Sequence, residues 1–390
     1  MIPSLMPIYN RADLAFVRGE GAYVFDDQGH RYLDFVAGIA VTAFGHAHPH
    51  LVAALKDQAE KIWHSSNLYR IPGQERLAAR LVDASFADTV FFTNSGAEAI
   101  ECAVKLVRRF QHGEGRPQRY RLITFRQAFH GRTMTAIAAT NQEKLRAGFG
   151  PLPDWFDVVP FGDVEAAEAA LGPETAGILI EPVQGEGGVS AAPQGFLKAL
   201  RALADQNDLL LVFDEIQCGM GRTGKLFAHE HDGVTPDVLA AAKGIGGGFP
   251  LGACLATQRA AQHMTAGSHG STYGGNPLAM AVGNAALDLL LAPGFLDRVA
   301  VMGERLGTAL DRLVAARPDM FEAVRGRGLM RGLKLKKPVG DMVAACRQHF
   351  LLTAPAAGDV LRLLPPLIID ESHIVEAAEK IAAAGDDLAP

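Results

Sequence analysis

The sequence predicts an α/β protein with a large domain, whose mostly parallel sheet has helices on both faces, and a smaller α+β domain. Between residues 90 and 257, short apolar strands alternate with helical patterns, which is the arrangement that builds a parallel sheet. The strands are continuous apolar runs, as expected where both faces of a sheet are buried. Six such strands stand out, at residues 90–92, 122–125, 177–180, 209–213, 238–241 and 254–256.

The residues before this region predict a smaller unit and two helices. Residues 14–35 contain three short strand patterns separated by glycine-containing turn sequences, which indicates a small antiparallel unit. Two helices are expected next, at residues 49–63 and 72–83. Each opens on a proline, a residue that suits the first helical position.

The residues after this region mix helices and strands. Two long helical patterns, at residues 277–291 and 296–316, are followed by short strands at 328–334 and 360–364. We therefore expect three parts: residues 1–45, an N-terminal segment that belongs to the small domain; residues 46–290, the large domain; and residues 291–390, the C-terminal α+β part of the small domain.

Composition narrows the classes of function. The net charge of −6 comes with no basic stripe, so nucleic-acid binding is not expected. The chain has 48% hydrophobic residues but no apolar run of the roughly 20 residues that span a membrane, so no membrane partner is expected. The N-terminus lacks the pattern of a secretory signal. The four cysteines are widely spaced, which indicates reduced thiols in a cytoplasmic protein.

Lys243 and Asp214 are the most informative pair of residues. Each follows an apolar strand pattern, and a run of glycines comes directly after Lys243. A buried lysine near a buried aspartate suits pyridoxal 5'-phosphate, because the amine forms a Schiff base with the aldehyde and the carboxylate keeps the pyridine nitrogen protonated. The glycines would let a flat ligand approach the backbone. A solvated lysine at a strand end is the alternative for an isolated lysine.

Several other motifs also follow predicted strands. Ser95 and Glu98 have the spacing of a capping box at a helix start, where free N–H groups and Gly96 also favour a bound phosphate. Arg132 has the side chain to grip a carboxylate with two parallel hydrogen bonds, and Phe129 is suited to stacking on a ring. Taken singly, each of these motifs has a structural alternative: a helix cap, a surface arginine or a core phenylalanine.

Two motifs suggest chemistry that the sequence does not support. Gly219, Gly221 and Gly224 match a dinucleotide fingerprint in spacing, but they do not directly follow the strand and no convincing helix begins on them. The histidines of residues 46–50 and 229–231 have no cysteine or aspartate cluster to complete a zinc site, so no metal is expected.

Taken together, these motifs resemble the class III pyridoxal-phosphate aminotransferases over nearly the whole chain. The matching segments, at residues 94–99, 129–133, 214–217, 243–250 and 270–277, are jointly very specific. Within the class, residues 37–41, 66–69 and 361–366 are most similar to the acetylornithine aminotransferases. The resemblance implies fold type I of the pyridoxal-phosphate enzymes, with a sheet of seven strands.

The resemblance also implies how the cofactor is held. Lys243 carries the cofactor and then moves the proton, Asp214 pairs with the pyridine nitrogen, and Gln217 lies near the ring hydroxyl. Phe129 stacks on the ring. The phosphate is held by Ser95, Gly96 and Ala97, together with Thr272 of the partner subunit, so a homodimer is expected.

For the substrates, the resemblance implies that Arg132 binds the α-carboxylate and that Ser271 lies beside it. Glu186 is expected to neutralise Arg362 while an uncharged acylated side chain is bound, and to release it for glutamate. Ornithine aminotransferases have a tyrosine, which holds a free α-amino group, where this chain has Ile39. The isoleucine favours a donor whose α-amino group is acylated or absent.

The expected reaction is transfer of the δ-amino group of acetylornithine to 2-oxoglutarate. Other ω-amino donors remain alternatives on the same fold: succinylornithine, succinyldiaminopimelate, ornithine and 4-aminobutyrate. A glutamate-semialdehyde aminomutase is a further variant. A non-catalytic protein that binds a small anion or a partner is the alternative from another class, and the intact Lys243 and Asp214 argue against it.

Overall fold

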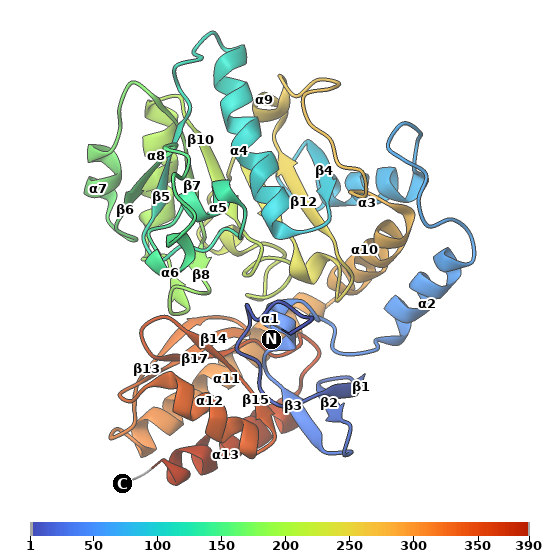
Figure 1. The fold of residues 1–390 in the computed structure, drawn as a ribbon, viewed down its shortest axis with the longest axis vertical. Coiled ribbons are helices and arrows are strands. Elements are labelled where there is room, and N and C mark those ends of the chain that lie inside the picture. The colour runs from blue at the N-terminus through green and yellow to red at the C-terminus, as the bar shows by residue number, and fades with distance from the viewer. Residues whose placement is uncertain (1–2, 389–390) are drawn as a thin grey trace.

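The computed structural model describes residues 3–388 and contains two packed parts (Figure 1). The upper part is built around a large sheet. The lower part combines the N-terminal strands with the C-terminal segment of the chain, so the two ends of the sequence contribute to the same half of the molecule.

The large sheet has seven strands in the order β4-β12-β11-β10-β7-β5-β6. All neighbouring strands are parallel except β12, which is antiparallel to both β11 and β4. The predicted α/β fold with a mostly parallel seven-stranded sheet is therefore confirmed. The strands are β4 (Thr89–Thr93), β5 (Arg121–Phe125), β6 (Phe156–Val159), β7 (Thr175–Ile180), β10 (Leu210–Asp214), β11 (Val238–Ala241) and β12 (Gly252–Ala256).

Strand β6 is the one that the apolar pattern did not reveal. It lies at the edge of the sheet, where it pairs only with β5. Its four residues include Asp157, whose carboxylate accepts hydrogen bonds from Arg121 on the neighbouring strand. An edge strand keeps one side open to solvent, so it does not need to be apolar throughout.

Helices cover both faces of the sheet, which explains the continuous apolar runs. On β10, Val212 packs in a buried cluster with α4 (Gly96–Gly113), whereas its neighbour Phe213 packs in a separate cluster with α8 (Phe196–Gln206). Because successive side chains of a strand point to opposite faces, both must be apolar. The other helices of this part are α2 (Pro49–Ala59), α3 (Pro72–Asp83), α5 (Met134–Ala138), α6 (Glu143–Arg146), α7 (Val164–Ala169), α9 (Gln258–Ala261) and α10 (Pro277–Leu290).

The helix predicted to run to Trp63 ends earlier, at Ala59. The side chain of Trp63 folds back, and its Nε1–H donates to the carbonyl oxygen of Ala59 over 2.7 Å. A donor at that position satisfies one of the unpaired carbonyls at the helix end and replaces a further helical turn. The helix predicted at residues 72–83 has the bounds that were expected.

The lower part contains two four-stranded sheets, in the orders β13-β14-β17-β16 and β1-β2-β3-β15. Their strands are β1 (Phe16–Glu20), β2 (Tyr23–Asp26), β3 (Arg31–Asp34), β13 (Phe321–Arg327), β14 (Met330–Leu335), β15 (Leu351–Leu352), β16 (Ala354–Ala356) and β17 (Val360–Leu363). Helices α11 (Phe295–Ala316), α12 (Val339–Gln348) and α13 (Glu371–Asp387) pack beside them. The remaining short elements are α1 (Ala37–Ala40), β8 (Val183–Gln184), β9 (Ser190–Ala191) and the 3-10 helices η1 (Ala228–His231) and η2 (Lys243–Ile245).

The strand predicted at residues 328–334 begins two residues later, at Met330, as the second strand of a hairpin. The prediction was therefore wrong at its start. Gly328 lies in the turn between β13 and β14, with a φ of 57°. A Cβ at this position would lie 2.5 Å from the Cα of Thr223. The glycine therefore marks a tight turn pressed against the large-sheet half, and it does not begin a strand.

The N-terminal strands are joined to the C-terminal part by pairing. β3 runs parallel to β15, with Leu33 opposite Leu351. This pairing supports the assignment of residues 1–45 and 291–390 to one domain. The division at residues 45 and 290 itself stays a prediction.

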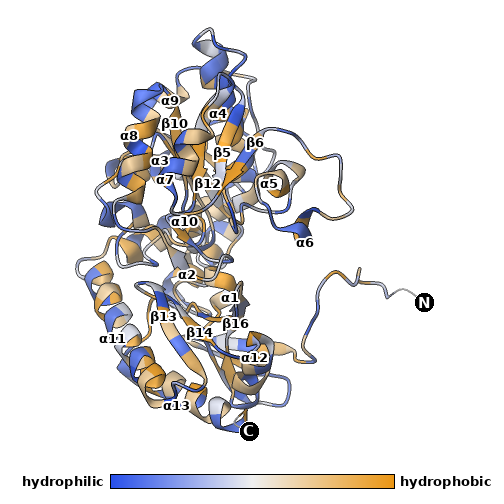
Figure 2. Ribbon diagram, turned by 90° about the vertical axis from the view of Figure 1, so that its left-hand side faces the viewer, coloured by the Kyte–Doolittle hydropathy of each residue, from blue (hydrophilic) through white to orange (hydrophobic). Residues whose placement is uncertain are grey.

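The hydropathy of the ribbon follows this layering, with hydrophobic strands inside the upper part (Figure 2). The segment before β1 extends away from the body and exposes the apolar side chains of Leu5, Met6, Ile8 and Tyr9. Between residues 3 and 388, no single helix is long and apolar enough to cross a membrane. α10 and α11 meet that test only as a pair bent by 71°.

Replacing Leu200 by alanine tests whether α8 is held by its apolar face. Leu200 is fully buried against the sheet, so we expect a loss of about 3 kcal/mol of unfolding free energy, the usual scale for a buried leucine. The matched control is Val375→Ala on α13, which is half exposed and should change stability by less than about 0.5 kcal/mol. Urea denaturation measures both, and equal losses would contradict this packing.

Candidate active site

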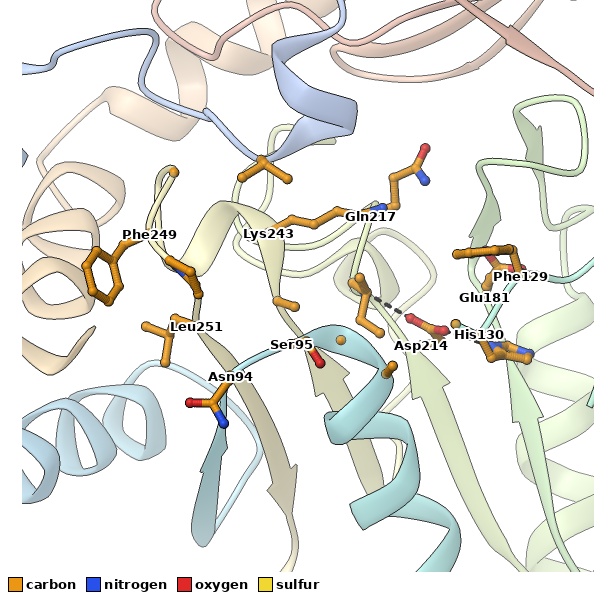
Figure 3. A pocket seen from close by; sticks show the side chains of 18 residues that line it. Asn94, Ser95, Phe129, His130, Glu181, Asp214, Gln217, Lys243, Phe249 and Leu251 are labelled. Carbon is orange, nitrogen blue, oxygen red and sulfur yellow. Dashed lines mark hydrogen bonds and ion pairs between the residues drawn. The ribbon is translucent and has the colours of Figure 1, made fainter. Parts of the chain in front are cut away.

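A cavity of about 350 Å³ opens at the carboxyl ends of the parallel strands. It is lined by residues that follow β4, β5, β7, β10 and β11, together with residues 248–251 just before β12. Open α/β sheets bind ligands at this edge, because the strands end there and the helices begin. Figure 3 shows the labelled side chains gathered around this space.

Seven of the predicted cofactor residues line this one cavity: Ser95, Gly96, Ala97, Phe129, Asp214, Gln217 and Lys243. They come from four separate segments of the chain, so the fold brings together motifs that the sequence only placed in order.

Lys243 stands at the end of β11, as predicted. Its backbone has a φ of 52°, a left-handed conformation that is uncommon outside glycine and tends to occur at functional sites. The side chain is partly exposed because it faces the cavity, but protein atoms surround its amine. Burial, and then the positive charge of Arg362, lower the pKa of Lys243 to about 8, despite three nearby carboxylates. An amine in this pKa range is still mostly protonated at pH 7, but its neutral, nucleophilic fraction is far larger than that of an ordinary lysine.

The glycines after Lys243 do not act in the way we expected. Only Gly248 of this run lines the cavity. Gly246 is instead needed for the local fold, because a Cβ there would lie 2.0 Å from the carbonyl oxygen of Phe249. The run therefore shapes a tight loop more than it clears room for a ligand.

Asp214 is the last residue of β10 and is almost fully buried. Its Oδ1 accepts the N–H of Ile216 over 3.0 Å, and its Oδ2 lies 2.7 Å from Nδ1 of His130. A carboxylate can only accept, so Nδ1 of His130 carries the hydrogen. The histidine thus fixes the orientation of the carboxylate. It was not among the predicted site residues, and this hydrogen bond makes it a positioning residue of the site.

Glu181 was missed as a site residue, although it directly follows β7 just as Asp214 closes β10. It is buried and lines the cavity, and one carboxylate oxygen accepts the N–H of Phe129 over 3.1 Å. Burial, and then the negative charge of Asp214, raise the pKa of Glu181 well above its ordinary value. The rule that finds Asp214, a carboxylate at the end of an apolar strand, would also have found Glu181.

The start of α4 forms one wall of the cavity. Ser95 is its N-cap, and its Oγ accepts the N–H of Glu98 over 3.3 Å. The carboxylate of Glu98 turns back to the N–H of Asn94 over 2.7 Å, one residue beyond a standard capping box. The N–H groups of Gly96 and Ala97 lie in the first turn, where helices have no internal acceptors. Together with the Ser95 hydroxyl, they are suited to binding an anion, as predicted for the phosphate.

Phe129 and Arg132 follow β5. Phe129 lines the cavity, whereas Arg132 lies outside the lining and is exposed. The guanidinium carbon of Arg132 is 5.6 Å from the centre of the Phe129 ring, which places the arginine at the rim. Its predicted contact with a substrate carboxylate stays a prediction.

Glu186 and Arg362 form an ion pair beside the cavity, without lining it. Arg362 is buried on β17, and Glu186 lies in the loop between β8 and β9. Arg362 also donates through Nη1 to Oε1 of Gln217, a lining residue, over 3.1 Å. The pair therefore bridges the two halves of the molecule and reaches the site through Gln217.

Ser271 and Thr272 lie in the segment that leads to α10, outside the cavity of their own chain. The Oγ of Ser271 accepts from Nδ2 of the lining residue Asn94 over 3.3 Å and from the N–H of Gly274 over 2.9 Å. Thr272 is exposed. Its expected contact with a neighbouring subunit stays a prediction.

Ile39 is half-buried in α1 and packs against the apolar cluster that contains Val183 and Val189. Val41, two residues further on, lines the cavity instead. Ile39 therefore lies next to the cavity without lining it. Its effect on donor choice stays a prediction.

The two motifs that were set aside have other structural explanations. No α-helix begins between Gly219 and Gly224 in the described structure, where the chain forms turns against α10 and α11. His46 and His50 bind the carboxylates of Asp34 and Asp288, which lie in different parts of the fold.

The residues of the cavity fit pyridoxal phosphate. Lys243 offers an amine for the aldehyde, Asp214 offers a carboxylate for the ring nitrogen, and Phe129 offers a flat apolar face. The anion site at Ser95 and Gly96 suits the phosphate. The volume lies at the lower end of the usual range for small-ligand sites, about 300–1,000 Å³.

Comparison with known proteins agrees with this geometry. The family model for class-III aminotransferases matches residues 8–384. The chain is a class III aminotransferase. Members of this family use pyridoxal phosphate, the cofactor predicted from Lys243 and Asp214.

Relatives of this class III aminotransferase match it over essentially their whole length. The acetylornithine aminotransferase of Rhodobacter capsulatus is 59% identical, covering 100% of this chain and 99% of that protein. The N-acetylornithine aminotransferase structure from Stenotrophomonas maltophilia is 41% identical, with a TM-score of 0.86 and 97% of each chain covered. The ornithine aminotransferase structure from Toxoplasma gondii is 32% identical, with a TM-score of 0.95, covering 99% of this chain and 93% of that one.

Replacing His130 tests its role as the partner of Asp214. In His130→Phe the carboxylate loses its donor, and the affinity for the cofactor should fall by at least about tenfold, because a hydrogen bond to a charged group contributes about 1.5–3 kcal/mol. The matched variant His130→Asn keeps an N–H near the position of Nδ1 and should retain most of the affinity. Titration of the cofactor-free protein measures Kd, and equal losses in the two variants would reduce His130 to a packing role.

The lowered pKa of Lys243 can be measured directly. In cofactor-free protein, its reaction with an amine reagent should be half-maximal at a pH of about 8, and Arg362→Gln should move this midpoint upward because a positive charge is removed. Arg305→Gln, at an exposed position on α11, is the control and should leave it unchanged. A wild-type midpoint near 10.5, the ordinary value, would contradict the account.

Proposed function

We propose that the protein transfers the δ-amino group of N2-acetyl-L-ornithine to 2-oxoglutarate, giving N-acetyl-L-glutamate 5-semialdehyde and L-glutamate, a reaction of arginine biosynthesis. The observation that carries the proposal is the buried Lys243 amine, with its pKa of about 8, in one cavity with Asp214. The choice of donor rests on the full-length similarity to acetylornithine aminotransferases, at 59% identity in one case.

The role of each residue in the cavity follows from its charge and its hydrogen bonds. When bound, pyridoxal phosphate supplies an aldehyde that accepts the amino group and a protonated ring that withdraws electrons. Asp214 keeps the ring nitrogen protonated, and His130 keeps Asp214 in place. The neutral Nζ of Lys243 takes the proton from the δ-carbon of the donor and returns a proton on the way to product.

Substrate binding requires two carboxylate sites. Arg132, at the rim beside Phe129, is suited to the carboxylate distant from the reacting carbon, which is the α-carboxylate of acetylornithine and the γ-carboxylate of 2-oxoglutarate. The second carboxylate of 2-oxoglutarate needs another cation, for which we assign Arg362. The existing ion pair between Arg362 and Glu186 neutralises that charge, which suits the donor half-reaction, since the acylated donor has no second carboxylate.

We also propose that the enzyme acts as a homodimer. Large apolar side chains are exposed around the segment that carries Thr272: Leu68 is 85% exposed, Tyr69 71% and Tyr273 63%. Neighbouring exposed apolar side chains favour contact with another protein surface, which supports this proposal. A second copy seated there would cover them and bring Thr272 of the partner subunit toward the phosphate site.

The proposed location is the cytoplasm. All four cysteines are free thiols in the structure, and disulfides are rare in reducing compartments.

A panel of amino donors with 2-oxoglutarate tests the substrate. Acetylornithine should give the highest kcat/KM, read out as glutamate, and should exceed free ornithine by at least about tenfold, or about 1.4 kcal/mol of transition-state binding. In Ile39→Tyr the ratio of ornithine to acetylornithine should rise, because a tyrosine hydroxyl can hold a free α-amino group. Equal use of ornithine, or an unchanged ratio in the variant, would replace the assignment by a broader ω-aminotransferase.

A further inference from the structure

We propose that Cys102 and Cys254 form a second reactive site, a dithiol that a hydroperoxide reaches through its own cavity and converts to a disulfide. This cavity, of about 520 Å³, shares no lining residue with the active site. It is bordered by Thr89, the first residue of β4, and Ala256, the last residue of the antiparallel β12. It therefore extends to the edge of the sheet opposite the active site.

The two thiols are brought together by packing of α4 on the sheet. Cys102 lies on the buried side of α4 and Cys254 in the middle of β12, and both line the cavity although they are only 1% and 3% exposed. Both also belong to the same buried cluster, in which α4 packs on β12. Two thiols in one cluster that line the same cavity are the arrangement that a redox-active pair requires.

Basic groups surround Cys102. The Nζ of Lys105, one helical turn further along α4, donates to Nδ1 of His269 over 2.9 Å. The ring of His269 lines the same cavity as the Cys102 thiol. Asp88 is an acidic group of the lining, and its Oδ2 accepts the N–H of Gln258 over 2.7 Å.

The surroundings of the two thiols shift their pKa values in opposite directions. The neighbouring Cys254 thiol, and then the His269 ring, lower the pKa of Cys102 to about 6 against the opposing effect of burial. The Cys102 thiol in turn raises the pKa of Cys254 well above its ordinary value. Cys102 is therefore the thiolate and Cys254 the neutral thiol near pH 7, which gives the pair a nucleophile and a resolving group.

The other two cysteines serve as internal controls. Burial raises the pKa of Cys218, and it raises that of Cys346 to about 12. Neither of them lines this cavity. Reactivity limited to Cys102 would therefore distinguish the site from general exposure of thiols.

The chemistry balances with one peroxide. The Cys102 thiolate attacks one oxygen, the O–O bond breaks, and hydroxide leaves and takes a proton to become water. Cys254 then gives up its proton and attacks the sulfur of the resulting sulfenic acid, the S–O bond breaks, and a second water forms with the disulfide. The two sulfurs lose two electrons, and the two peroxide oxygens gain them.

Alkylation of the native holoenzyme tests the nucleophile. With iodoacetamide at pH 7, followed by unfolding and mass mapping, Cys102 should react on the order of a hundredfold faster than Cys346, since it is the ionised thiol. Its rate should be lost as the pH falls through about 6. Lys105 is exposed and lines neither cavity. Because Lys105→Gln removes a positive charge near Cys102, this midpoint should rise. Equal rates for Cys102 and Cys346, or a midpoint near 9, would overturn the proposal.

Hydrogen peroxide tests the pair. Treated holoenzyme should yield a Cys102–Cys254 peptide cross-link that dithiothreitol reverses. Cys346→Ser should leave this unchanged, whereas Cys254→Ser should abolish the cross-link and leave Cys102 as a sulfenic acid that dimedone traps. No cross-link in the wild-type protein, or over-oxidation of Cys102 at the same rate with and without Cys254, would refute it. Because Lys105→Gln keeps every cysteine, it tests whether Cys102 is the nucleophile even if a cysteine variant does not fold.

Discussion

Charge balance in one buried cavity is the interaction on which the site depends. The edge of the sheet places the amine of Lys243 with the carboxylates of Asp214 and Glu181, all of them at strand ends. Buried charges are costly unless they compensate one another, so each group shifts its neighbours. Burial raises the pKa of Glu181 and lowers that of Lys243 to about 8, while the nearby carboxylates oppose the shift at the amine.

The same electrostatics connect the two halves of the molecule. Arg362 comes from the small sheet, Glu186 from the large-sheet half, and Gln217 links them to the cavity. Because the charge of Arg362 also lowers the pKa of Lys243, any substrate that displaces Glu186 from Arg362 changes the field at the amine. If Arg362 binds the second carboxylate of 2-oxoglutarate as proposed, substrate choice and amine chemistry are coupled through a single arginine.

Sequence reasoning found most of the fold and most of the cavity, for identifiable reasons. Strands buried on both faces are continuous apolar runs, so β10 and β11 were plain, whereas the edge strand β6 contains Asp157 and was missed. Lys243 and Asp214 stand at strand ends, where the sequence itself marks them. His130 could not be assigned from sequence, because its role depends on a contact with Asp214 across 84 positions. The hairpin at Gly328 depends on Thr223, which is even more distant in sequence and adjacent only in the fold.

Lys243→Ala is the most direct test of the central claim, with Lys198→Ala on the exposed side of α8 as control. Both proteins should fold and bind the cofactor, the first without a covalent link. The account predicts that Lys243→Ala loses turnover of acetylornithine with 2-oxoglutarate, while Lys198→Ala keeps it. Turnover of Lys243→Ala near that of the wild-type protein would contradict the assignment of this amine and of the cavity built around it.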